Sequence, residues 1–110
     1  MRVKFSIRLF MWFFISSSLY ARDYFVSRDN PALATIAAAN LLHLSAGDRL
    51  LFKGGETFRG TLILEPDEAG TGTAPIEISS YGEGRAKLVA ENGHGIYVIN
   101  SEGIQISNLE

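Results

Sequence analysis

The densest group of side chains that could do chemistry is acidic. Glu65, Asp67 and Glu68 stand close together on one predicted loop. A calcium ion in a protein takes about six to eight oxygen ligands from carboxylates and carbonyls, so these acids could supply part of such a site. The plainer interpretation is a solvated loop, because unpaired acidic residues are rarely buried. We favour the solvated loop and assign no metal ligand in this chain.

The two histidines offer a second kind of site. His43 and His94 lie far apart in the sequence, and no cysteine accompanies them. A zinc site uses three or four protein ligands, so two histidines alone do not predict one. We expect His43 near the end of a helix, where a cation is favourable, and His94 in a turn.

Three basic residues, Arg59, Arg85 and Lys87, could act beside a sugar uronate, where an Arg or Lys base removes a proton. Without an acidic metal site beside them, surface charge is the favoured interpretation.

The segment 53–57 is Gly-rich, but its lysine precedes its glycines and no helix follows, so it is not a phosphate-binding loop. We expect its glycines to allow positive φ at a tight corner. We assign no catalytic residue.

Aromatic side chains on predicted strands could stack on sugar rings. The candidates are Tyr24, Phe25, Tyr81 and Tyr97. Aromatic residues at strand positions more often pack in the core or across strands, so this pattern alone is weak. We keep Tyr81 as the candidate carbohydrate-binding residue.

These side chains must be positioned by one helix and a series of short strands. Asn30 is a good N-cap, Pro31 suits the first helical position, and an apolar stripe at helical spacing follows, which predicts a helix over residues 31–42. From Arg49 onward, short apolar stretches alternate with turns rich in Gly, Asn, Asp and Ser. The predicted strands cover residues 22–27, 49–53, 56–59, 61–65, 76–81, 87–90, 95–100 and 104–110. Asn100 and Asn108 are expected to support stacked turns.

Two all-β architectures suit this pattern. One is a small antiparallel sandwich built from hairpins, and the other is a parallel β-helix, in which each coil contributes short strands to separate sheets. Ile76/Ile78 and Ile96/Val98 recur after 20 positions, which is the right order for one coil. An amphipathic helix before the first coil would cover the open end of a stacked core.

The first 21 residues have the pattern of a secretory signal peptide. Three basic residues precede the unbroken apolar run at residues 9–15, and small residues lead to Ala21. The run is shorter than the roughly 20 residues that a membrane span needs. We predict cleavage after Ala21, an extracellular or periplasmic location for residues 22–110, and no membrane association after cleavage. A non-cleaved anchor is the alternative.

The composition of residues 22–110 limits the classes of molecule that they are expected to bind. Without residues 1–21, seven Lys and Arg face 12 Asp and Glu, a formal charge of −5. This charge argues against nucleic acid as a partner, and it leaves no basic patch for polyanionic sugars. The chain has no cysteine, so disulfides do not hold the fold and its stability comes from packing and backbone hydrogen bonds.

The segment from Ala46 to Gly60, AGDRLLFKGGETFRG, resembles the "PGD-x-I-x-F-x-x-G-x-x-F/Y-x-G" opening of secreted right-handed parallel β-helix proteins, the pectate-lyase-like superfamily. Residues 72–82, 95–100 and 104–110 resemble the segments that follow in those proteins. The likeness covers residues 22–110, and Ala46 replaces the usual proline. It implies an all-β fold: the N-terminal coils of a right-handed parallel β-helix with one capping α-helix, in a chain that is incomplete.

The resemblance implies a carbohydrate-active class without choosing the reaction. Members include polysaccharide lyases, which use Ca²⁺ held by acidic residues, and glycoside hydrolases, which use paired Asp. No residue here matches those groups, so the implied function is binding or acting on polysaccharide, without activity or a cofactor in this segment alone. The alternatives are a non-catalytic β-helix adhesin, surface-binding or scaffold module, and a truncated gene fragment. The open strand at 104–110 predicts contact with further coils or self-association.

Overall fold

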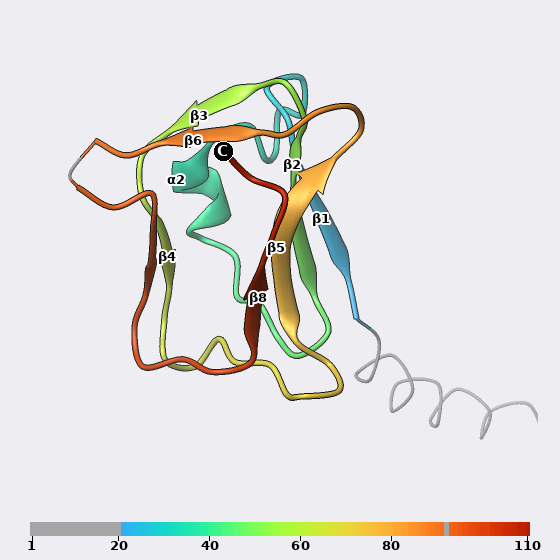
Figure 1. Ribbon diagram of the computed structural model, residues 1–110, viewed down its shortest axis with the longest axis vertical. Helices are drawn as coiled ribbons and strands as arrows, with labels where there is room; N and C mark the ends of the chain where they lie inside the picture. The colour runs from blue at the N-terminus through green and yellow to red at the C-terminus, as the bar shows by residue number, and fades with distance from the viewer. Residues whose placement is uncertain (1–20, 92) are drawn as a thin grey trace, which may run out of the picture.

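The computed structural model describes residues 21–91 and 93–110 as short strands with one short helix (Figure 1). Residues 1–20 of the predicted signal peptide lie outside the described residues. The elements in chain order are β1 (Asp23–Val26), α2 (Ile36–Ala39), β2 (Arg49–Lys53), β3 (Thr57–Arg59), β4 (Leu62–Leu64), β5 (Ile76–Tyr81), β6 (Lys87–Val89), β7 (Ile96–Val98) and β8 (Ile104–Ile106). Among the described residues, no helix is long and apolar enough to cross a membrane.

In residues 21–91 and 93–110 the strands form three small sheets, and every strand pairing described there is parallel. One sheet has four strands in the order β1-β2-β5-β8, and the other two pair β3 with β6 and β4 with β7. From β2 onward the chain visits the three sheets in turn, so each strand pairs with the strand three elements later. The sheets lie on three sides of a common interior, and α2 lies across that interior in this view (Figure 1).

The structure corrects the predicted fold class. The described residues form mostly short strands in small parallel sheets with a single short helix, and a right-handed parallel β-helix is not evident in them. The antiparallel sandwich is wrong as well, because the described pairings are parallel. The turns limit strand length physically: Asn100 and Asn108, at φ 46° and 56°, take the left-handed conformation that interrupts extended chain.

The predicted recurrence of 20 residues is also wrong. Ile76 and Ile78 align with Ile104 and Ile106, not with Ile96 and Val98. Ile96 belongs to a different sheet, where it aligns with Leu62. The apolar spacing misled because strands of different sheets carry the same alternation, so a match in pattern does not identify the partner strand.

The core lies in the space that the three sheets share. Val26, Leu50 and Phe52 enter it from the four-stranded sheet, Leu62 and Leu64 enter from β4, and all five side chains are buried. This is the alternation that a strand imposes, since successive side chains point to opposite faces. Phe52 and Phe58 meet edge to face with ring centroids 5.1 Å apart. The polar side chains on the opposite faces are therefore presented outward.

The helix begins much later than the predicted helix over 31–42. The Leu33 carbonyl accepts a hydrogen bond from the Ser27 N–H at 3.1 Å, which closes a loop where the first helical turns were expected. Thr35 then caps α2 in an extended conformation, and its hydroxyl accepts from the Ala38 N–H at 3.0 Å. The apolar stripe predicted helix, but local loop hydrogen bonds replace it.

The helix also ends early, because Asn40 turns its amide towards the chain around β4. Its Nδ2 donates to the Thr61 carbonyl at 2.9 Å, and its Oδ1 accepts from the Ile63 N–H at 2.8 Å. These two bonds join residues more than 20 positions apart. A tertiary contact of this kind overrides helix propensity, and the spacing of apolar residues cannot show it.

Candidate functional site

The outer face of the sheet β1-β2-β5-β8 carries an apolar residue that does not belong to the core. Leu50 and Phe52 are in the core cluster, whereas Leu51 between them is 5% exposed and lies outside that cluster. Strand alternation places Leu51 on the opposite face of the sheet. It aligns with Phe25 on β1 and with Ser79 on β5, so these side chains share that outer face.

Phe25 and Tyr81 meet across this face. Their rings pack edge to face, with centroids 5.1 Å apart and an interplanar angle of 80°. Phe25 comes from β1 and Tyr81 from β5, the two strands that flank β2. Phe25 is 44% exposed and Tyr81 is half-buried, so the pair is open to solvent. We call Phe25, Leu51 and Tyr81 the aromatic patch.

Polar groups lie on both sides of the aromatic patch. Lys53 aligns with Tyr81, and its Nζ lies 3.9 Å from the Asp29 Oδ2. Towards the start of the strands, Arg49 donates from Nε at 2.9 Å and from Nη2 at 2.7 Å to the Asp23 carboxylate. The hydrogen bond from Arg49 holds the pKa of Asp23 below its ordinary value, and Asp23 raises the pKa of Arg49. The face therefore combines an aromatic surface with fixed donors and acceptors.

This combination suits a sugar ring. One face of a pyranose carries mainly C–H groups, which pack on aromatic rings, and its rim carries hydroxyls that need hydrogen-bond partners. Aromatic residues provide apolar area, and tyrosine adds a hydroxyl at the edge. Tyr81 was the candidate predicted from the sequence, and the structure brings Phe25 to it. Pairing of a residue on β1 with one on β5 depends on the strand order, which sequence spacing did not predict.

Another aromatic pair lies away from this sheet. His94 stacks on Tyr97 with ring centroids 5.3 Å apart and an interplanar angle of 13°. Tyr97 is on β7, in the two-stranded sheet with β4, and is 49% exposed. His94 lies in the segment just before β7, and its carbonyl accepts from the Thr61 hydroxyl at 2.6 Å.

The acidic loop is not simply solvated, because Glu68 is buried. Its Oε2 accepts from the Leu44 N–H at 3.0 Å, and its Oε1 accepts from the Glu65 N–H at 2.9 Å. Asp67 is exposed and lies 3.6 Å from Nδ1 of His43. Within the described residues, no three His, Cys, Asp or Glu side chains gather as metal ligands. Glu68 therefore ties together the loops before β2 and after β4, a structural role that the sequence analysis missed.

The basic residues do not converge with the aromatic patch. Arg59 lies on β3 and Lys87 on β6, in the sheet that pairs these two strands, and Arg85 comes just before β6. All three are exposed. In the described part of the chain, no carboxylate lies within 4.0 Å of their cationic groups. They carry surface charge here, which is the interpretation favoured from the sequence.

In the Gly-rich segment 53–57, Gly54 and Gly55 are required for two different structural reasons. Gly55 has φ +84°, the positive value expected at a corner. Gly54 has no positive φ, but a methyl group there would overlap the carbonyl oxygens of Glu83 and Gly84. The close approach of two turns therefore explains Gly54. The segment is a structural corner beside Tyr81, whose carbonyl accepts from the Gly54 N–H at 2.7 Å.

Comparison with known proteins assigns no family to this chain. No protein-family model matches it, and neither the curated proteins nor the solved structures contain a match.

Proposed function

We propose that residues 22–110 belong to an exported protein and bind polysaccharide through the aromatic patch. The observation that carries the proposal is the edge-to-face contact of Phe25 and Tyr81 on an outward sheet face, where Phe25 stays 44% exposed. A ring pair held by two strands of one sheet is a rigid surface, so little conformational entropy is lost when a sugar packs on it. The pectate-lyase-like opening motif supports polysaccharide as the class of ligand.

The proposal is for binding, and it assigns no catalytic residue. The groups that flank the aromatic patch are already engaged: Asp23 with Arg49, and Lys53 with Asp29. Paired groups of this kind suit the orientation of sugar hydroxyls, since each retains further donor or acceptor positions. They are not the converging carboxylates, or the carboxylate and base, that glycosidic bond cleavage uses.

A panel of polysaccharides tests this function. The full chain is run by affinity electrophoresis through gels that contain xylan, soluble cellulose derivatives or polygalacturonate. We expect retardation in at least one gel, and about tenfold weaker retardation for Tyr81→Ala. The matched control is Tyr97→Ala, which removes a more exposed tyrosine from another sheet. No retardation in any gel, or equal loss in both variants, would reject the proposal.

One observation favours a second candidate function, a self-associating scaffold. β8 is an edge strand with β5 as its one described neighbour, and Ile106 on it is 46% exposed. An open edge with an exposed apolar side chain is a template for pairing with another strand. Sedimentation of the full chain over a range of concentrations checks this. Association that Ile106→Lys reduces supports the scaffold, and a monomer at every concentration excludes it.

A further inference from the structure

The edge of β3 offers backbone hydrogen-bonding groups that no described strand uses. The Glu56 carbonyl accepts from the Lys87 N–H at 2.9 Å, and the Gly60 N–H donates to the Val89 carbonyl at 3.0 Å. In a parallel pair, alternate residues direct their backbone groups to the same neighbour. Glu56 and Gly60 therefore face β6, and the backbone groups of Thr57 and Arg59 face the other way.

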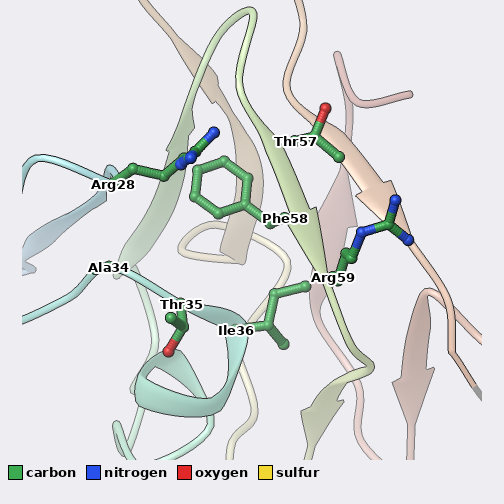
Figure 2. A pocket seen from close by; sticks show the side chains of 7 residues that line it. All are labelled: Arg28, Ala34, Thr35, Ile36, Thr57, Phe58 and Arg59. Atoms are coloured by element: carbon green, nitrogen blue, oxygen red, sulfur yellow. The ribbon is translucent and has the colours of Figure 1, made fainter.

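That free edge borders a pocket. The pocket has a volume of about 370 Å³, and its lining residues are Arg28, Ala34, Thr35, Ile36, Thr57, Phe58 and Arg59 (Figure 2). Figure 2 shows the Phe58 ring leaving β3 on the side where Arg28 lies, while the side chains of Thr57 and Arg59 leave on the other side. Ile36 and Phe58 give the pocket an apolar floor, since both are buried in the core. The edge of β3 thus faces a hollow.

In the four-stranded sheet, β2 follows β1 and would have a similar free edge if β1 did not pair with it. There β1 pairs with β2, and Asp23 aligns with Arg49. The Asp23 carboxylate takes two hydrogen bonds from the Arg49 guanidinium, on the outer face of the sheet. An extended segment with an acidic residue opposite an arginine is therefore how this protein closes the edge of β2. In the sheet β3-β6, no described strand lies on the side of β3 opposite β6.

The positive charges at the edge of β3 would also favour an extended segment that carries an acidic residue. Arg59 and Arg28 are exposed, and no carboxylate of residues 21–91 or 93–110 lies within 4.0 Å of either guanidinium. The acidic group at this edge is Glu56, whose Oε1 accepts from the backbone N–H of Arg28 at 2.9 Å. Glu56 does not line the pocket, and the charged side chains that do are those of Arg28 and Arg59.

We propose that the edge of β3 binds an extended acidic peptide segment as an added strand. The segment hydrogen-bonds with the backbone of Thr57 and Arg59, and its Asp or Glu pairs with Arg59, as Asp23 pairs with Arg49. Backbone bonds supply most of the affinity, and the charge pair selects acidic over neutral segments. This site is separate from the aromatic patch and does not depend on polysaccharide binding.

A peptide titration tests the proposal on the full chain. The probe is the peptide Ac-SVDVSV-NH2, and its neutral counterpart is Ac-SVNVSV-NH2. Amide resonances of the ¹⁵N-labelled protein are followed during the titration. We expect the largest shifts at Thr57 and Arg59, and about two- to fivefold weaker binding of the neutral peptide, the range for an exposed ion pair. Absence of shifts at these residues, or equal affinity for both peptides, overturns the proposal.

Two variants separate edge pairing from general charge attraction. Thr57→Pro removes a backbone donor that faces away from β6, a position where an edge strand tolerates proline, so binding should be lost. Arg59→Gln should abolish the preference for the acidic peptide while the neutral peptide binds as before. Lys87→Gln on the neighbouring strand is the matched control and should change neither. Equal effects of Arg59→Gln and Lys87→Gln would show attraction without strand pairing and would refute the proposal.

Discussion

Asp23 and Arg49 form a two-point ion pair between neighbouring parallel strands. The guanidinium donates from Nε at 2.9 Å and from Nη2 at 2.7 Å, one bond to each carboxylate oxygen. The register of β1 on β2 places the two residues directly opposite each other. The pair therefore holds β1 at the outer edge of the sheet that carries the aromatic patch.

This pair gives the stability of the protein a defined pH dependence. Arg49 lowers the folded-state pKa of Asp23, so the pair stabilises the fold above the unfolded value of about 4. That contribution is lost as the pH falls through the lower folded-state pKa. Urea unfolding of the wild type and Asp23→Asn should therefore differ at pH 7 and converge in acid. In an Arg49→Gln background the same comparison should show no such convergence, and its persistence there would contradict the assignment.

Glu68 should contribute much more to stability than its acidic neighbour on the same loop. Glu68→Ala leaves the N–H groups of Leu44 and Glu65 without their acceptor, which costs roughly 2–4 kcal/mol if neither finds water. Glu68→Gln keeps one acceptor oxygen and should cost less. Asp67→Asn is the exposed control and should change the free energy of unfolding by about 0.5 kcal/mol or less. Equal stability of the Glu68→Ala and Asp67→Asn variants in urea unfolding would disprove this role.

Gly54 should be the least replaceable residue of the corner after β2. A methyl group there overlaps backbone carbonyl oxygens, so Gly54→Ala should lower stability by about 1–3 kcal/mol or more. Gly72 is the matched control, because a methyl group at that position meets nothing within 4 Å. Thermal unfolding of both variants decides the point. A Gly54→Ala variant as stable as Gly72→Ala would mean that the two turns do not approach as closely as described.

Strand positions were the most predictable part of the fold, because alternation and turn residues are local signals. The predicted strands at 49–53 and 76–81 have the bounds of β2 and β5, and the predicted strand at 104–110 is shortened to Ile104–Ile106. The partners of the strands were not predictable in the same way. Ile78 aligns with Ile106 although its sequence surroundings also match Val98. Such pairing depends on loop lengths and on packing across the interior, which apolar spacing does not encode.

In the candidate site, too, local features could be predicted from the sequence and long-range contacts could not. Tyr81 could be named from the sequence because an aromatic residue on a predicted strand can be recognised from local pattern alone. Phe25 could not be joined to it, because 56 positions separate the two residues and only the strand order β1-β2-β5 brings them together. Glu68 was misjudged for a related reason. The Glu68 carboxylate oxygens accept hydrogen bonds from the backbone N–H groups of Leu44 and Glu65. Every residue except proline has such a group, so residue types in the sequence do not show which ones will be paired.

The most direct test of polysaccharide binding at the aromatic patch is an NMR titration of the ¹⁵N-labelled full chain. The ligand is an oligosaccharide of the polysaccharide that retards the protein most. We predict that the largest amide shifts map to Phe25, Leu51 and Tyr81, and that Tyr81→Ala weakens binding about tenfold. The Tyr97→Ala variant should bind as the wild type does. Shifts centred on β7, or undiminished affinity of Tyr81→Ala with the fold intact, would contradict the proposed site.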